Sequence, residues 1–102
     1  MPGAIDVVTP LGFRVQCNQQ RWMLISQLKH PALRDSLLAV TATLREPDQI
    51  RRSARDEDVL VFHRRWEPRW LSAVVRTSGG DAFLVTAYPA DKIKAGELLW
   101  TK

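Results

Sequence analysis

Three β-prone runs between residues 58 and 89 constrain this chain more than any other feature of its sequence. They cover residues 59–66, 70–76 and 82–88, and each is rich in apolar, β-branched and aromatic side chains. Glu67 with Pro68, and then Gly79 with Gly80, separate the runs as short turn-forming connections. Apolar runs with such connections are typical of antiparallel hairpins. The sequence therefore predicts a three-stranded antiparallel meander in the C-terminal part of the chain.

The N-terminal part begins with two further β-like patches, residues 5–9 and 13–17. In the second patch apolar residues alternate with Arg14 and Gln16, which is the signature of a half-buried strand. Cys17 is expected to be a core thiol, because no partner for a nucleophilic role lies near it in the sequence. A single cysteine also excludes an intrachain disulfide and a zinc site built from cysteines.

Two helices are predicted next, on either side of a joint at His30 and Pro31. Asn18 is a suitable N-cap for the first helix, which is expected to run through residue 29. The second is expected over residues 31–45, because proline disfavours helical geometry before it and suits a first helical turn. An apolar stripe at helical spacing predicts its buried face. The stripe consists of Leu33, Leu37, Val40 and Leu44.

This order of elements predicts a single α+β domain over residues 1–102, with its core roughly over residues 13–100. Two N-terminal helices are expected to pack on one face of a curved antiparallel sheet that ends in the three-stranded meander. A chain of 102 residues can bury a single modest core. The N-terminus has no signal-peptide pattern and no stretch is apolar enough to span a membrane. A cytoplasmic protein without a metal is therefore expected.

The charge balance permits a polyanionic partner without requiring one. Fifteen lysines and arginines against eleven acidic residues give a net charge of +4. Arginines alternate with Trp66 and Trp70 around the first turn of the meander, an arrangement that suits stacking on the bases of single-stranded RNA. A cross-strand contact between the two tryptophans, stabilising the hairpin, explains the same residues. Both interpretations stay open.

Several short motifs occur together in an order and spacing that resemble a known family. They are His30-Pro31 at a helix start, residues 43–50 (TLREPDQI), residues 62–64 (FHR), residues 83–88 (FLVTAY) and residues 93–100 (IKAGELLW). Over roughly residues 13–100 the chain is similar to the phage-encoded branch of the barnase–EndoU–colicin–RelE-like (BECR fold) nucleases. The resemblance implies a RelE/barnase-like fold and RNA cleavage without a metal or other cofactor.

Cleaving RNA without a metal needs a base for the 2′-hydroxyl, an acid for the departing 5′-oxygen and donors that stabilise the phosphorane. On the family pattern, His30 is the candidate for proton transfer and Arg64 for charge stabilisation. Thr86 and Tyr88, two apart on one strand face, are the candidates for holding a phosphate oxygen. The residues expected to contact the substrate are Arg51, Ser53, Arg69 and Trp70.

Each candidate also has a structural interpretation. His30 could cap the helix joint, Arg64 could extend from the core edge to solvent, and Thr86 and Tyr88 are ordinary strand residues. His63 is expected at the surface of its strand, and its alternative role is that of a substitute acid or base. Two functions stay open: a small ribonuclease, toxin-like or phage-associated, and a non-catalytic module that binds RNA or a protein. A toxin-like nuclease would also have a neutralising protein partner. Convergence of the four catalytic candidates on one cleft would favour the enzyme.

Overall fold

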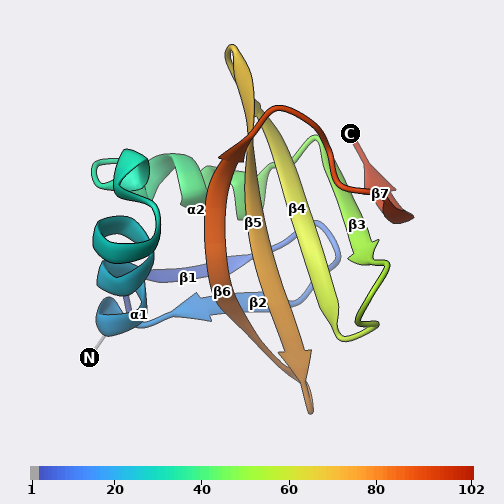
Figure 1. Ribbon diagram of the computed structural model, residues 1–102. Helices are drawn as coiled ribbons and strands as arrows, with labels where there is room; N and C mark the ends of the chain where they lie inside the picture. The colour runs from blue at the N-terminus through green and yellow to red at the C-terminus, as the bar shows by residue number, and fades with distance from the viewer. Residues whose placement is uncertain (1–2) are drawn as a thin grey trace.

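A computed structural model describes residues 3–102 and is built on one seven-stranded sheet (Figure 1). The strands are β1 (Ile5–Val8), β2 (Arg14–Cys17), β3 (Gln49–Ser53), β4 (Val59–Trp66), β5 (Arg69–Ser78), β6 (Asp81–Ala90) and β7 (Gly96–Thr101). Their order across the sheet is β1-β2-β6-β5-β4-β3-β7. All neighbouring strands are antiparallel except β2 and β6, which run parallel, so the sheet is mixed.

The central strands confirm the predicted meander. β4 pairs with β5, and β5 with β6, each antiparallel and consecutive along the chain. The two hairpin turns lie where Glu67-Pro68 and Gly79-Gly80 predicted them. Both glycines of the second turn have positive φ, 56° and 92°. Side chains rarely tolerate this backbone region, which explains why glycines occupy the turn.

The predicted fold class is wrong in the proportion of strand to helix and in the position of the helices along the chain. Strands hold 47% of the residues and helices 23%, and the sheet is mixed rather than antiparallel. The helices lie mid-chain, between β2 and β3, instead of forming an N-terminal pair ahead of the sheet. The two N-terminal patches pair with each other as β1 and β2 and join the sheet beside β6. Pairing between segments so far apart in sequence leaves no periodic signal along the chain.

The helices themselves are shorter and more irregular than predicted. α1 (Gln19–Met23) continues into a π-helix, η1 (Leu24–Lys29), and a 3-10 helix, η2 (Pro31–Leu33), precedes α2 (Leu37–Arg45). The predicted helix over residues 31–45 is therefore interrupted at residues 34–36. The Asn18 N-cap is confirmed, since its side-chain oxygen accepts a hydrogen bond of 2.7 Å from the Arg21 backbone N–H.

Helix α2 packs on one face of the central strands, which we call the helix face. Leu33, Val40 and Leu44 of the predicted stripe are fully buried in the hydrophobic core, whereas Leu37 is half-buried against it. The strand residues of this core include Ile50, Phe62, Leu71, Ala73, Val75 and Leu84. No helix within residues 3–102 has both the length and the apolar character needed to cross a membrane.

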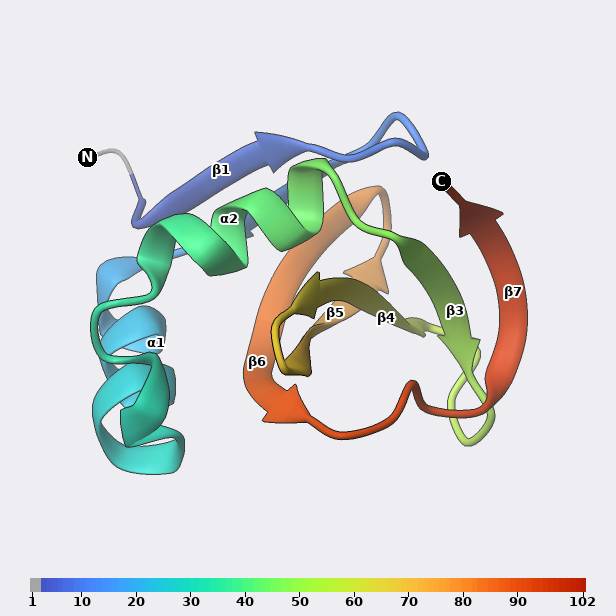
Figure 2. The same cartoon turned by 90° about the horizontal axis from the view of Figure 1, so that it is seen from above.

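The opposite face of the central strands is covered by a different part of the chain. Figure 2 shows α2 on one side of β4 and β5, and the segment that leads from β6 to β7 on the other side. This segment, residues 91–95, brings the chain across the sheet to pair β7 with β3. We call the face beneath it the crossover face. It holds the side chains that alternate with those of the helix face along β4 and β5, among them His63 and Ser72 but also Val61 and Val74.

Candidate functional site

A row of four polar side chains crosses the sheet on the crossover face. The strand register places Gln49 opposite His63, His63 opposite Ser72, and Ser72 opposite Tyr88. Directly opposed residues of neighbouring strands point to the same face, so these four side chains lie side by side across β3, β4, β5 and β6. We refer to Gln49, His63, Ser72 and Tyr88 as the polar row.

His63 is the most buried ionisable group of this row. Its side chain is 0% exposed, and its Nδ1 lies 2.7 Å from the Ser72 hydroxyl oxygen in a hydrogen bond. Burial, together with the nearby positive charges of Arg51 and Lys94, lowers the pKa of His63 to about 4. The ring is therefore neutral at pH 7, with one nitrogen that donates and one that accepts. The expectation of a surface histidine is wrong, because the His63 side chain is fully buried on the crossover face.

Three buried polar atoms of the crossover face have no hydrogen-bond partner among the residues that the structure describes. They are His63 Nε2, the Thr86 hydroxyl and the Tyr88 hydroxyl. Thr86 lies opposite Val74, on the same face as Tyr88, as their spacing predicted. Burial also raises the pKa of Tyr88, so its hydroxyl stays protonated at neutral pH. Buried polar groups are nearly always paired, so three unpaired ones on one face mark it as unusual.

A basic pocket of about 310 Å³ opens on the same face, next to the polar row. Its lining residues are Arg51, Arg52, Ser53, Ala54, Arg55, Val59, Val61, Val74, Lys94 and Ala95. Four of these residues are cationic, one carries a hydroxyl and none is acidic. Val61 and Val74 form an opposed pair two residues along from His63 and Ser72, so the pocket and the polar row are neighbours. A larger pocket of about 550 Å³ beside β2 and β6 has only two cations, and one of them, Arg76, pairs with Asp56.

Two of the four cations are held in place by hydrogen bonds. Arg51 donates from Nε to the Gln49 side chain at 2.9 Å and from Nη1 to the Gly96 carbonyl at 2.8 Å. Arg52 donates to the Glu57 carbonyl at 2.8 Å and forms an ion pair with Glu97 at 3.2 Å. The contact of Arg51 with β7 depends on Gly96, because a side chain there would collide with the Arg52 carbonyl oxygen.

The other two cations, Arg55 and Lys94, are exposed and form no ion pair with any residue from 3 to 102. Arg55 follows β3, and Lys94 belongs to the crossing segment, so they approach the pocket from separate parts of the chain. The Ser53 hydroxyl accepts a hydrogen bond from the Arg55 backbone N–H at 3.2 Å, which orders the part of the pocket lining formed by residues 53–55. Two fixed and two unpaired cations make the pocket suited to an anion.

The structure brings some of the predicted site residues together and separates others. Arg51 and Ser53 both line the basic pocket, and Thr86 and Tyr88 share the crossover face with His63. His30, at the end of η1, is half-buried, and its ring centroid lies 6.0 Å from that of Tyr88. Arg64 lies opposite Leu71 on the helix face. The four catalytic candidates therefore do not converge on one cleft, since strand alternation points Arg64 away from Thr86 and Tyr88.

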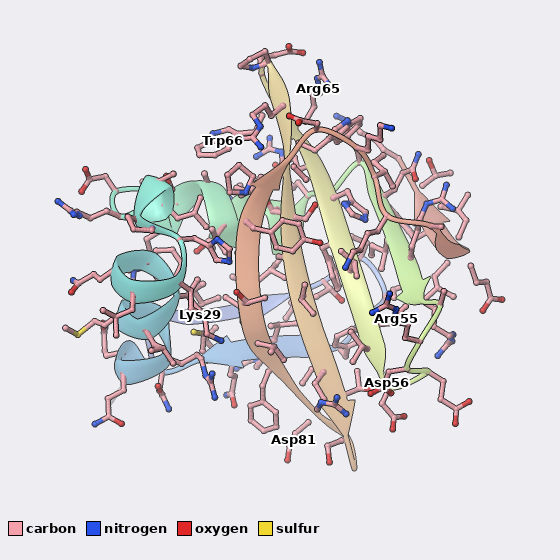
Figure 3. All side chains as sticks on the ribbon, viewed as in Figure 1. Lys29, Arg55, Asp56, Arg65, Trp66 and Asp81 are labelled. Carbon is pink, nitrogen blue, oxygen red and sulfur yellow. The ribbon has the colours of Figure 1, made fainter. Side chains whose placement is uncertain are left out.

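Arg69 and Trp70 lie apart from the basic pocket, at the other end of the sheet. Figure 3 shows neighbouring Arg65 and Trp66 at this end and Arg55 toward the opposite end. Arg69 forms an ion pair with Asp91 at 2.9 Å, and Trp70 lies under the Arg65 guanidinium at 5.2 Å. The register places Trp70 opposite Arg65, so the predicted cross-strand contact of Trp66 with Trp70 is wrong. The two tryptophans point to opposite faces.

Ser72, Arg55 and Lys94 were not singled out as functional by the sequence, and His63 was considered only as a substitute acid or base. The sequence does contain a signal that places His63 opposite Ser72. The two-residue turn at Glu67-Pro68 places Trp66 opposite Arg69, and counting back three residues on each strand places His63 opposite Ser72. Nothing in the sequence places Lys94 beside β3, because that contact depends on the path of the crossing segment.

Comparisons with known proteins add no assignment. Scans against protein-family models, curated proteins and solved structures found no match to this chain. The resemblance to the BECR nucleases therefore rests on the short motifs alone, and it remains a hypothesis.

Proposed function

We propose that this protein binds RNA through the basic pocket, with the pocket's cations contacting phosphate groups. One observation supports this most directly: four cationic residues and a hydroxyl line a pocket that has no acidic lining residue. Lysine and arginine contacts to phosphates release counterions, which supplies most of the affinity of sequence-independent nucleic-acid binding. Arg51 and Ser53 were also expected from the sequence to contact a substrate. Because RNA is the ligand, we place the protein in the cytoplasm.

Binding without catalysis fits the arrangement better than the predicted catalytic set does. Arg64 lies on the helix face, where it cannot reach a phosphate that contacts Thr86 or Tyr88. His30 approaches only Tyr88 of that set. A binding function needs none of these residues to meet, only the cations of the basic pocket.

Metal-independent RNA cleavage is a second candidate, supported by the polar row. With Nδ1 donating to Ser72, the neutral His63 ring presents Nε2 as an acceptor that has no partner among the described residues, on the same sheet face as the Tyr88 hydroxyl. In such a reaction a base takes the 2′-hydroxyl proton, the 2′-oxygen attacks phosphorus, and the bond to the 5′-oxygen breaks as that oxygen is protonated. The crossing segment would have to move first, because His63 is fully buried.

The binding proposal is tested by fluorescence anisotropy with single-stranded RNA over a range of salt concentrations. Arg55→Gln combined with Lys94→Gln is expected to weaken binding about tenfold and to reduce the salt slope by roughly 1.4, about 0.7 for each lost phosphate contact. The matched control is Arg34→Gln with Arg45→Gln, which removes the same charge from exposed positions next to η2 and at the end of α2. Equal losses in both double variants, or no binding by the unmodified protein, would reject the pocket as the site.

The cleavage candidate needs a separate experiment. Pure protein is incubated with mixed RNA in EDTA, and the fragment ends are analysed for 2′,3′-cyclic phosphates. His63→Gln should reduce such an activity by roughly 10²–10⁴-fold, as expected for loss of a general base. His30→Gln, which leaves the polar row intact, distinguishes the two histidines. Cleavage that depends on added Mg²⁺, or that persists in His63→Gln, contradicts this chemistry.

A further inference from the structure

We propose that the basic pocket recognises a phosphomonoester, at the end of an RNA strand or on a free nucleotide, in preference to an internal phosphodiester. The inference rests on the proposed function and specifies its ligand. Three properties of the pocket support this inference: its charge, its shape and the apolar residues that line part of it.

The charge of the pocket exceeds what one diester needs. Arg51, Arg55 and Lys94 form no ion pair with any residue from 3 to 102 and line a volume of about 310 Å³ that has no acidic lining residue, whereas the charge of the fourth lining cation, Arg52, is paired with Glu97. An internal phosphodiester carries one negative charge, whereas a phosphomonoester carries nearly two above its second pKa of about 6. Attraction to a fixed set of cations grows in proportion to the charge of the ligand. The pocket therefore favours the dianion.

The shape of the pocket suits a chain end. Residues 51–55 form one wall and Lys94 with Ala95 form the other, so two separate segments enclose the volume. About 310 Å³ lies near the lower limit of pockets for small ligands, which makes room for roughly one nucleotide. A continuous strand needs a groove that it can enter and leave, with cations spaced along it. Here all four cations line one volume of that size.

The apolar part of the pocket lining favours a nucleotide over a bare inorganic anion. Val59, Val61 and Val74 present apolar surface below the cations. Phosphate alone gains nothing from contact with valine side chains, whereas a ribose or a base buries apolar area there. The combination of a cationic rim and an apolar floor therefore fits a phosphate that is attached to an organic group.

The decisive experiment compares oligoribonucleotides of one sequence that carry a 5′-phosphate, a 3′-phosphate or only hydroxyl ends. One of the phosphorylated forms is expected to bind at least about tenfold tighter than the hydroxyl form at pH 7.5, a difference of about 1.4 kcal/mol. This preference should shrink below pH 6, where the monoester takes up a proton. A nucleoside monophosphate should compete with it, and the nucleoside should not.

Variants locate the preference in the basic pocket. Arg55→Gln and Lys94→Gln, at exposed positions, should each reduce the preference for the phosphorylated end several-fold, whereas Arg34→Gln should preserve it. Ligand charge between Arg51 and Lys94 should also raise the pKa of His63, which proton NMR of the ring measures directly.

The outcomes separate this inference from the proposed function. Equal affinity for all three oligoribonucleotides overturns the preference for a phosphomonoester and leaves RNA binding standing. Binding of the nucleoside monophosphate without measurable binding of any oligoribonucleotide supports the pocket's ligand class and overturns RNA binding. A preference that survives in both pocket variants places the phosphate elsewhere and overturns the inference.

Discussion

At their centres the two faces of the sheet are equally buried but differ in chemistry. Phe62 and Ala73 are opposed on the helix face, and one residue along the strands His63 and Ser72 are opposed on the crossover face. All four are 0% exposed. On the helix face burial removes apolar area from water and stabilises the fold. On the crossover face it leaves His63 Nε2, Thr86 Oγ1 and Tyr88 Oη without a partner among residues 3–102, and each such atom costs stability.

This difference shows that burial alone does not identify a core. A sheet face that only packs would be expected to carry apolar residues, as the helix face does, because they give more stability for the same area. The crossover face instead keeps unpaired polar atoms beside a cationic pocket. Such local conflict with packing is expected where a protein has a functional site. The two faces should therefore differ in their contribution to the free energy of unfolding.

The largest effect is expected on the helix face. Phe62→Ala should lower the free energy of unfolding by about 3–5 kcal/mol, because a fully buried aromatic ring leaves a cavity in the core. Denaturant unfolding followed by circular dichroism measures this loss. A decrease below about 1 kcal/mol would mean that the helix face is not the principal core.

The pH dependence of stability should reveal the crossover face. The folded pKa of His63 is about 4 and its ordinary value is 6.5, so between these pH values the unfolded chain binds a proton that the folded protein does not. The free energy of unfolding should therefore fall as the pH is lowered from about 6.5 to about 4, and this group should add nothing further below that range. The total loss is at most about 3.5 kcal/mol, at roughly 1.4 kcal/mol for each pKa unit.

Variants assign this dependence to one histidine. Denaturant midpoints measured across the same pH range should vary less in His63→Gln, whereas His30→Gln should retain the full variation. Stability that varies equally in the two variants would contradict a neutral, buried His63.

Two identical substitutions should have opposite effects on stability. The Thr43 hydroxyl in α2 donates to the Ala39 carbonyl at 2.8 Å, whereas the Thr86 hydroxyl has no partner among the described residues. Thr43→Val should lower the free energy of unfolding by about 1 kcal/mol, and Thr86→Val should leave it unchanged or raise it by up to about 1 kcal/mol. Thermal melts of the two variants provide the comparison. A clear loss for Thr86→Val would show that its hydroxyl is paired in solution.

Local features of the fold could be predicted from the sequence because they depend on neighbouring residues. Turn-forming residues between apolar runs defined the meander, and Asn18 marked the start of α1. The spacing of Thr86 and Tyr88 placed both side chains on one face, since side chains alternate along a strand. Arg51 and Ser53 lie two residues apart in the sequence. Both were predicted to contact a substrate, and both line the basic pocket.

The other features of the fold and of the site depend on pairing between segments that are far apart in the sequence. The seven-stranded sheet, the parallel contact of β2 with β6 and the break before α2 depend on which distant segments bury one another. The site depends on the same choice: the crossing segment brings Lys94 to Arg51 and buries His63, while β4 points Arg64 into the opposite face. A period of two along a strand divides its residues between two faces, but it does not say what covers either face. Only the tertiary structure determines which segment covers each face, because this depends on the total apolar area that the whole chain can bury.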